Sequence, residues 1–135
     1  MSTIPTVTGE VDVADLGRTY MHEHVFVLTP DVQANFPDEW GSEDDRVADA
    51  VERLKALAAQ GIRTIVDPTV IGLGRYLPRI QRINEQVDIN IVVATGIYTY
   101  NDLPFQFHYT GPGLLFDVPE PMVELFVKDI REGIA

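Results

Sequence analysis

The sequence predicts an α/β fold in which about three β/α units form the N-terminal part of a (β/α)8 TIM-type barrel, preceded by a small β-hairpin. Short β-rich runs alternate with amphipathic helical patterns, which is the order of consecutive βαβ units. The last β-rich run, residues 90–95, is almost entirely apolar, as a parallel strand buried on both faces is. A whole barrel takes about 250 residues, so 135 residues accommodate only its first part.

The first expected elements are a cap and a strand. Residues 6–13 are β-prone around a turn at Gly9, so residues 1–18 should form a small hairpin or cap. Residues 19–27 are expected to form the first strand of the three β/α units, which occupy residues 19–135. A polar loop with two prolines follows this strand.

A long helix is expected after the polar loop. Ser42 followed three residues later by Asp45 resembles a capping box, with Asp in place of the usual Glu or Gln. Gly61 is placed to end the helix as its C′ residue. The apolar positions between these ends recur at helical spacing: Val47, Ala50, Val51, Leu54, Leu57 and Ala58. Of these, Val47, Val51 and Leu54 are expected to pack on the sheet.

The next two units repeat the pattern, and we expect all three strands to be parallel with right-handed crossovers. Strands are predicted at residues 64–67, stopped by Pro68, and at residues 90–95. The helix between them is marked by Leu77, Ile80, Ile83 and Val87. A long loop over residues 96–119 precedes a last helix that begins at Pro121. One side of this helix carries Val123, Phe126, Val127 and Ile130. Phe126 and Ile130, like Ile80 and Ile83 of the preceding helix, are expected to pack on the sheet.

Composition limits the function classes. Apolar residues make up 45% and charged residues 23% of the chain, as in ordinary globular proteins, and the lack of cysteine excludes disulfides and thiolate chemistry. A net charge of −11 disfavours nucleic-acid and anionic-lipid partners. No apolar stretch approaches the roughly 20 residues of a membrane span, and the first residues lack signal-peptide features. We therefore expect residues 1–135 to be a single segment of a soluble, cytoplasmic protein.

The strongest chemical signal is the pair His22 and His24 on the first predicted strand. Side chains two residues apart on a strand share one face, so both imidazoles can bind one ion. Imidazole suits zinc, cobalt, iron and nickel, and a catalytic site needs at least one further protein ligand. The carboxyl ends of barrel strands also form the active-site face. The alternative is that the two histidines share a strand face by chance.

Weaker candidates follow the second and third strands. Asp67 can contact a residue that binds the metal, although hydrogen bonds that fix the loop to nearby backbone are the favoured interpretation. Residues 72–75 lack the spacing of a dinucleotide-binding loop and are interpreted as a turn. His108 lies in an aromatic loop, where packing or a hydrogen bond is favoured over metal binding. Tyr98 and Tyr100 can supply a phenol to a substrate or only pack at the barrel mouth.

Three motifs in the same order, MHEHVF, TIVDPTVIGLGR and NIVVATGIYTYNDLPF, resemble the phosphotriesterase family, and within it the phosphotriesterase-like lactonases. The resemblance extends from about Thr8 to the end of the chain. It implies a (β/α)8 barrel of the amidohydrolase type with two divalent metal ions, usually zinc, cobalt or iron. Tyr76 is a departure, because many members have aspartate there, and a family loop contact is therefore in doubt.

The resemblance also implies roles for individual residues. His22 and His24 would bind the more buried metal, and Tyr98 would lie near the bridging hydroxide and the substrate carbonyl as a catalytic residue. The substrate pocket would be surrounded by four residues: Val27, Leu73, Tyr98 and Tyr100. The family's other ligands, a carboxylated lysine, two histidines and an aspartate, would follow residue 135. This chain alone is therefore expected to be inactive.

The implied function is metal-dependent hydrolysis, in which the metals lower the pKa of a bridging water. Lactones, above all the N-acyl-homoserine lactones of quorum sensing, are the expected substrates, and promiscuous hydrolysis of phosphotriesters is expected beside them. The resemblance also makes a homodimer an expectation. One alternative is a complete, non-catalytic α/β binding module, which the open sheet edges disfavour. The other is a different amidohydrolase, such as a deaminase or dihydroorotase, against which the GLGR and GIYTY segments count.

Overall fold

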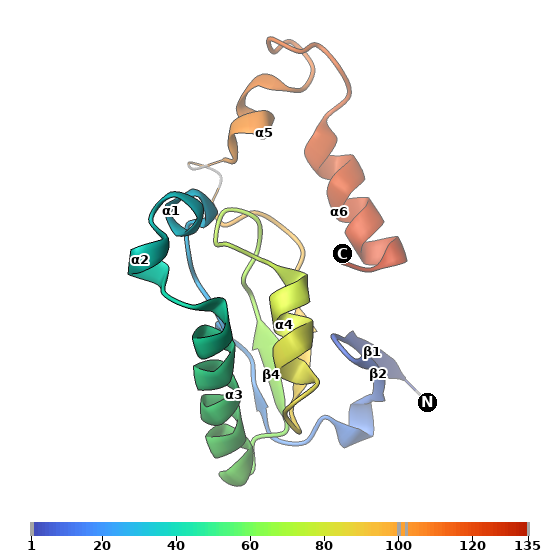
Figure 1. The fold of residues 1–135 in the computed structure, drawn as a ribbon. Helices are drawn as coiled ribbons and strands as arrows, with labels where there is room; N and C mark the ends of the chain where they lie inside the picture. The colour runs from blue at the N-terminus through green and yellow to red at the C-terminus, as the bar shows by residue number, and fades with distance from the viewer. Residues whose placement is uncertain (1, 100, 102, 135) are drawn as a thin grey trace.

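The computed structural model describes residues 2–99, 101 and 103–134. Its centre is a three-stranded sheet in the order β3–β4–β5, against which α3 and α4 pack (Figure 1). The strands are β3 (Thr19–Tyr20), β4 (Thr64–Asp67) and β5 (Asn90–Val93). Both pairings are parallel. The predicted parallel arrangement is therefore confirmed, as are the predicted bounds of β4.

The helix α3 (Glu43–Ala59) begins and ends as the sequence predicts. The backbone N–H of Asp45 donates to Ser42 Oγ at 3.4 Å, and Gly61 takes the left-handed conformation, with a φ of 87°. Together with α4 (Leu77–Asn84) and the sheet, this helix encloses one core. Its buried members are Val47, Ala50, Val51, Leu54, Ile62, Ile65, Ile80, Ile83, Ile89 and Ile91. The five residues predicted to pack these two helices on the sheet all belong to this core: Val47, Val51, Leu54, Ile80 and Ile83.

The expected N-terminal hairpin is present, with different bounds. It consists of β1 (Thr3–Thr6) and β2 (Gly9–Asp12), and a short 3-10 turn over Val13–Asp15 follows. The two strands pair antiparallel, with Thr6 opposite Gly9. The turn therefore lies at residues 7–8 and not at Gly9, and the first strand starts earlier than predicted.

The first parallel strand is much shorter than the predicted residues 19–27. The strand β3 stops at Tyr20, and the chain bends at residues 21–22. Beyond the bend it still follows β4: Glu23 N donates to Val66 O at 3.1 Å. Val25 N then donates to a side-chain oxygen of Asp67 at 3.4 Å. A carboxylate thus takes the place of a backbone carbonyl, which interrupts the regular ladder.

Two other predicted bounds are wrong. The helix α4 ends at Asn84, because the Asn84 side chain donates to Ile89 O at 2.7 Å and closes a turn; Val87 lies in this turn, where it packs partly buried against the core. The strand β5 ends at Val93, two residues before the predicted end. The predicted loop 96–119 also contains a short helix, α5 (Phe105–Tyr109), that follows a proline and buries Phe107.

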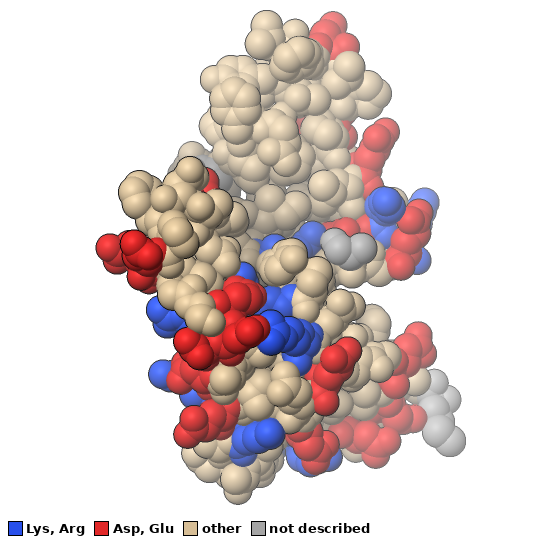
Figure 2. All heavy atoms as spheres, viewed as in Figure 1, with Lys and Arg blue, Asp and Glu red and all other residues tan. Residues whose placement is uncertain are grey.

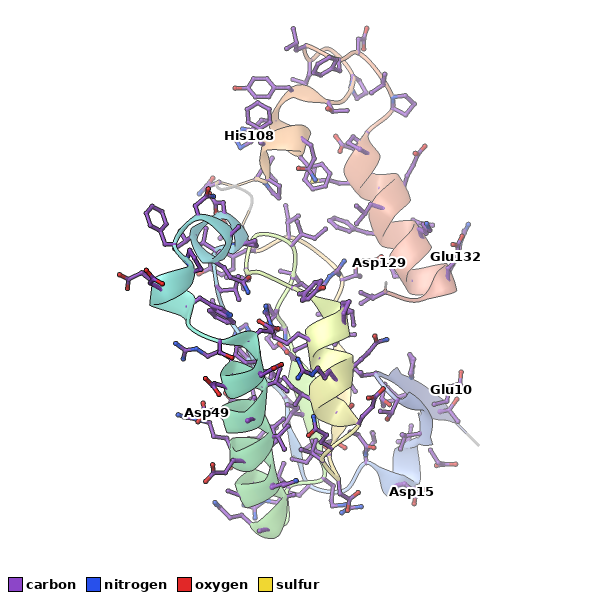
Figure 3. All side chains as sticks on the ribbon, viewed as in Figure 1. Glu10, Asp15, Asp49, His108, Asp129 and Glu132 are labelled. Atoms are coloured by element: carbon purple, nitrogen blue, oxygen red, sulfur yellow. The ribbon has the colours of Figure 1, made fainter. Side chains whose placement is uncertain are left out.

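The last helix, α6 (Pro121–Glu132), begins at the predicted proline. Its predicted packing on the sheet is wrong for Ile130, which is 74% exposed, whereas Phe126 is half-buried. Val123 and Val127 on the same side of the helix are 60% and 37% exposed. A polar contact holds the helix instead: Asp129 accepts from Thr95 Oγ1 at 2.6 Å and from Arg75 Nη1 at 3.2 Å (Figure 3).

The predicted polar loop before α3 contains two short helices, α1 (Pro30–Asn35) and α2 (Pro37–Trp40). Each starts with a proline, whose fixed φ suits the first helical turn. Both lie above the N-terminal end of α3 (Figure 1). In the part of the chain that the structure describes, no helix has the length and apolar character that crossing a membrane requires.

Candidate functional site

The two histidines of the candidate metal centre lie side by side in the irregular segment after β3. The centroids of the His22 and His24 rings are 5.1 Å apart, and the ring planes meet at 79°. The prediction that the two side chains come together is therefore confirmed. The reason differs, because a bend at residues 21–22 places them there and not the pleat of a regular strand.

A polar network behind His24 fixes its ring. His24 Nδ1 is 2.8 Å from Thr69 Oγ1, and Thr69 Oγ1 is 2.5 Å from Asp67 Oδ1. Asp67 is 2% exposed and accepts from two backbone N–H groups, Thr69 N at 2.9 Å and Val25 N at 3.4 Å. Asp67 therefore fixes the loop through hydrogen bonds with backbone, which is the interpretation favoured from the sequence. Through Thr69 it also reaches the candidate ligand His24.

The pair fits a divalent transition metal in chemistry and spacing. Neutral imidazole is a ligand for zinc, iron and cobalt. Two imidazoles on one tetrahedral ion, each about 2.0–2.1 Å from it, would hold their ring centroids about 5 Å apart, close to the observed 5.1 Å. Among the described residues no group of three or more His, Cys, Asp or Glu side chains is placed to hold a metal.

Tyr98 lies where the loops after β4 and β5 meet. Ile71 and Ile97 form an isolated parallel bridge beyond the two strands, and Tyr98 N donates to Ile71 O at 3.1 Å. The Tyr98 side chain is 58% exposed and therefore accessible to a small molecule. Tyr100, the other predicted phenol, lies outside the described residues.

Leu73 belongs to a tight turn that contacts the histidine-bearing segment. Leu28 N donates to Leu73 O at 3.1 Å. Gly74 has a φ of 87°, and a Cβ on it would lie 2.5 Å from Leu28 O, so this close approach requires glycine. Residues 72–75 are thus the turn that the sequence predicts, and the turn fixes the loop after β4 against the segment that carries the histidines.

Val27 lies beside a groove that it forms with the two short helices α1 and α2. Val27 is 55% exposed and lines a groove of about 260 Å³ together with Val32, Phe36 and Trp40 of α1 and α2. Neither Leu73 nor Tyr98 is among the residues that line this groove. Val27 therefore faces a groove that Leu73 and Tyr98 do not line.

His108 is placed on α5, apart from the sheet (Figure 3). Its ring Nε2 is 2.8 Å from Leu103 O, and the ring lies beside that of Tyr109. The interpretation that His108 forms a local hydrogen bond is therefore confirmed.

A buried arginine near the site is not among the residues predicted from the sequence. Arg79 is 4% exposed, and its guanidinium group lies 5.2 Å from the Phe26 ring, 4.9 Å from the Trp40 ring and 5.3 Å from the Tyr76 ring. It donates to both carboxylate oxygens of Glu43, at 2.6 and 3.1 Å. The sequence does indicate that Arg79 is buried, because it lies four residues before Ile83 and therefore on the same, buried side of α4.

Charge pairing surrounds this arginine. Hydrogen bonds from Arg79 hold the pKa of Glu43 below its ordinary value, although partial burial acts in the opposite direction. Arg82 on the next turn pairs with Asp44 at 2.6 Å. Figure 2 shows basic and acidic side chains interleaved where α3 meets α4. Both arginines of α4 are thus paired with carboxylates of α3.

This fold and site define a class of protein: a mixed α/β chain in which two histidines, separated by one residue and with their rings side by side, follow the first parallel strand. The sequence matches the phosphotriesterase family over residues 2–135, and the chain belongs to that family. Membership sets it apart from the deaminases and dihydroorotases considered as alternatives.

Individual relatives agree with this assignment. The chain is 58% identical over all 135 residues to the phosphotriesterase homology protein of Mycobacterium tuberculosis, of which it covers 41%. It is 38% identical over 124 residues to the aryldialkylphosphatase of Saccharolobus solfataricus, covering 92% of this chain and 37% of that protein. The solved structure of the phosphotriesterase from M. tuberculosis matches with a TM-score of 0.93 at 57% identity, over 99% of this chain and 41% of the other. The chain thus spans about two fifths of the length of these relatives.

Proposed function

We propose that this chain supplies the first β/α units and two metal ligands of a (β/α)8 metal-dependent hydrolase. The observation that carries the proposal is the contact between the His22 and His24 rings, 5.1 Å apart, beside the end of the parallel sheet. The membership of the phosphotriesterase family supports it. The remaining ligands would come from sequence outside these 135 residues, so we expect the chain alone to be inactive.

The residues of this chain have distinct tasks in the proposed reaction. His22 and His24 would hold the more buried of two divalent ions, zinc, cobalt or iron. Bound divalent ions make hydroxide available near neutral pH and polarise a carbonyl or phosphoryl oxygen. The Tyr98 hydroxyl, which is exposed at the loop face, would donate a hydrogen bond to the substrate oxygen on which negative charge develops.

Lactones are the proposed preferred substrates, with N-acyl-homoserine lactones first among them. The resemblance of the GIYTY run to the lactonase branch supports this choice, as do the apolar side chains of Val27 and Leu73, which suit an acyl tail. A neutral substrate is also not repelled by a chain of net charge −11. The aryldialkylphosphatase among the relatives supports phosphotriester hydrolysis as a second activity.

Kinetics of the full-length protein test this proposal. We expect a higher kcat/KM for an N-acyl-homoserine lactone than for a phosphotriester. Chelation should abolish both activities, and zinc or cobalt should restore them. A higher kcat/KM for the phosphotriester than for every lactone tried would contradict the substrate assignment. Activity that survives complete removal of metal would contradict the metal dependence itself.

A further inference from the structure

The hydroxyl of Thr69 lies between the ring of His24 and the carboxylate of Asp67. Thr69 Oγ1 is 2.8 Å from His24 Nδ1 and 2.5 Å from Asp67 Oδ1. His24 Nδ1 and Asp67 Oδ1 are themselves 3.8 Å apart, which is too long for a hydrogen bond. The ring therefore reaches the carboxylate through the threonine hydroxyl.

The positions of the protons follow from what each atom can do. Both oxygens of Asp67 face backbone N–H donors, Thr69 N at 2.9 Å and Val25 N at 3.4 Å, so the carboxylate acts as an acceptor. Thr69 has one hydroxyl proton. Its other acceptor, Phe26 O at 3.4 Å, is much farther than Asp67 Oδ1, so the proton is directed at Asp67. Thr69 Oγ1 must then accept from His24, which places a hydrogen on Nδ1 and leaves the lone pair of the neutral ring on Nε2.

The burial of this carboxylate supports a specific role. Asp67 is 2% and Thr69 6% exposed, and no lysine or arginine among the described residues forms an ion pair with Asp67. A buried carboxylate without a cation is costly unless hydrogen bonds compensate it. His22 differs, because it is exposed and no comparable hydrogen bond to its ring exists within the described part of the chain.

We propose that Thr69 and Asp67 are positioning residues that hold His24 in the Nδ1–H tautomer and present its Nε2 to a divalent metal ion. This inference rests on the proposed metal site, for which it specifies the ligating atom. A hydrogen bond from the second ring nitrogen to such a partner fixes the orientation of a ligating histidine and raises its basicity. His24 is thus oriented before a metal arrives, whereas His22 has no such restraint in the described residues.

The tautomer can be measured without metal. We suggest nitrogen NMR of the metal-free, full-length protein labelled at histidine, with the His24 signals assigned from a His24→Gln variant. In the unmodified protein we expect the hydrogen on Nδ1 of His24. In Thr69→Val the Nδ1–H tautomer should no longer be the dominant one. Hydrogen on Nε2 of His24 in the unmodified protein would overturn the inference. The tautomer of His24 is read on the unmodified protein without metal or activity, so this readout does not depend on the proposed hydrolase function.

Zinc affinity tests the consequence. Thr69→Val keeps the shape of the side chain but removes the hydroxyl, and should weaken zinc binding about 10–100-fold, the range for loss of such a partner. Thr69→Ser restores the hydroxyl and should bind zinc much as the unmodified protein does. Thr64→Val is the matched control, because Thr64 is 1% exposed and donates to Leu16 O at 2.6 Å at the other end of β4; its zinc affinity should be unchanged.

The outcomes separate the inference from the proposed function. Full zinc affinity in a folded Thr69→Val protein would overturn the role of the hydroxyl while the metal site stands. An unmodified full-length protein that binds no zinc, cobalt or iron would contradict the proposed function, and with it the presentation of Nε2 to a metal. Equal weakening in Thr69→Val and Thr64→Val would show a general loss of stability and also overturn the specific role of Thr69.

Discussion

Arg79 donates two hydrogen bonds to Glu43, from Nε at 2.6 Å and from Nη2 at 3.1 Å. The pair joins α4 to the first turn of α3, and the arginine is buried while the carboxylate is 38% exposed. Aromatic rings from the histidine-bearing segment and from α2 surround the guanidinium group. One ion pair therefore connects both helices to the segment that carries the candidate site.

Removal of the arginine should be costly. Arg79→Ala leaves Glu43 without its main partner and the aromatic rings without their cation. Breaking a fully buried pair costs about 3–5 kcal/mol. Because Glu43 is partly exposed, we expect the free energy of unfolding to fall by less, about 2 kcal/mol. Urea denaturation measures this. Arg53→Ala, which breaks an exposed pair with Asp49, is the control and should cost less than about 0.5 kcal/mol. Equal losses in both variants would contradict the importance of burial.

The same pair should make stability depend on pH. The pKa of folded Glu43 lies below its ordinary value of 4.5, chiefly because Arg79 donates hydrogen bonds to the carboxylate. Its contribution to stability is therefore present above the unfolded pKa and is lost as the pH falls through the folded pKa. The melting temperature of Glu43→Gln should lie below that of the unmodified protein at pH 7. This gap should narrow below about pH 4.5. A gap that stays constant or widens on acidification would rule out the charge of Glu43 as its cause.

The orientation of α6 should depend on Asp129. Its carboxylate accepts from Thr95 and from Arg75, whose side chain is only 11% exposed. Asp129→Ala removes both contacts, so hydrogen exchange in α6 should become faster while exchange in α3 stays the same. Glu132→Ala on the same helix is the control, because Glu132 is exposed (Figure 3) and its side chain forms no hydrogen bond or ion pair with another described residue. Unchanged exchange in α6 of Asp129→Ala would show that other contacts hold the helix.

Sequence reasoning succeeds here where the signals are local. A serine cap, a C′ glycine and an apolar stripe lie within one helix, so the bounds of α3 follow from neighbouring residues. A strand stopped by Pro68 is likewise predictable, as β4 shows. The packing of α6 is not predictable from its own residues, because its apolar face suggests burial on the sheet. A contact between Arg75 and Asp129, 54 residues apart, places the helix differently.

The candidate site shows the same limit. Two histidines separated by one residue are a local signal, and the structure brings their rings together. The hydrogen bond that holds the His24 ring comes from Thr69, 45 residues away in the chain. A single threonine after a strand has no pattern that distinguishes a hydrogen-bond partner from an ordinary loop residue. The bond from Val25 N to the Asp67 carboxylate, 42 residues away in the chain, is also a tertiary effect that no local pattern predicts.

The hydroxyl of Tyr98 should matter for catalysis in the full-length protein. Tyr98→Phe keeps the ring and removes only the donor. A donor directed at the oxygen on which charge develops contributes about 10²–10³ in rate, so we expect kcat for lactones to fall by that factor with little change in KM. Steady-state kinetics measure this. A variant that hydrolyses lactones as fast as the unmodified enzyme would show that Tyr98 only packs at the loop face.

The central claim, that His22 and His24 bind metal, is tested most directly by the metal content of a full-length His22→Ala/His24→Ala variant. Elemental analysis of the unmodified protein should find about two divalent ions per protomer, as in two-metal hydrolases, and the folded double variant should lose at least the more buried one. His108→Ala is the control and should keep its full metal content, because the His108 ring hydrogen-bonds Leu103 O. The same metal content in the double variant as in the unmodified protein would contradict the account.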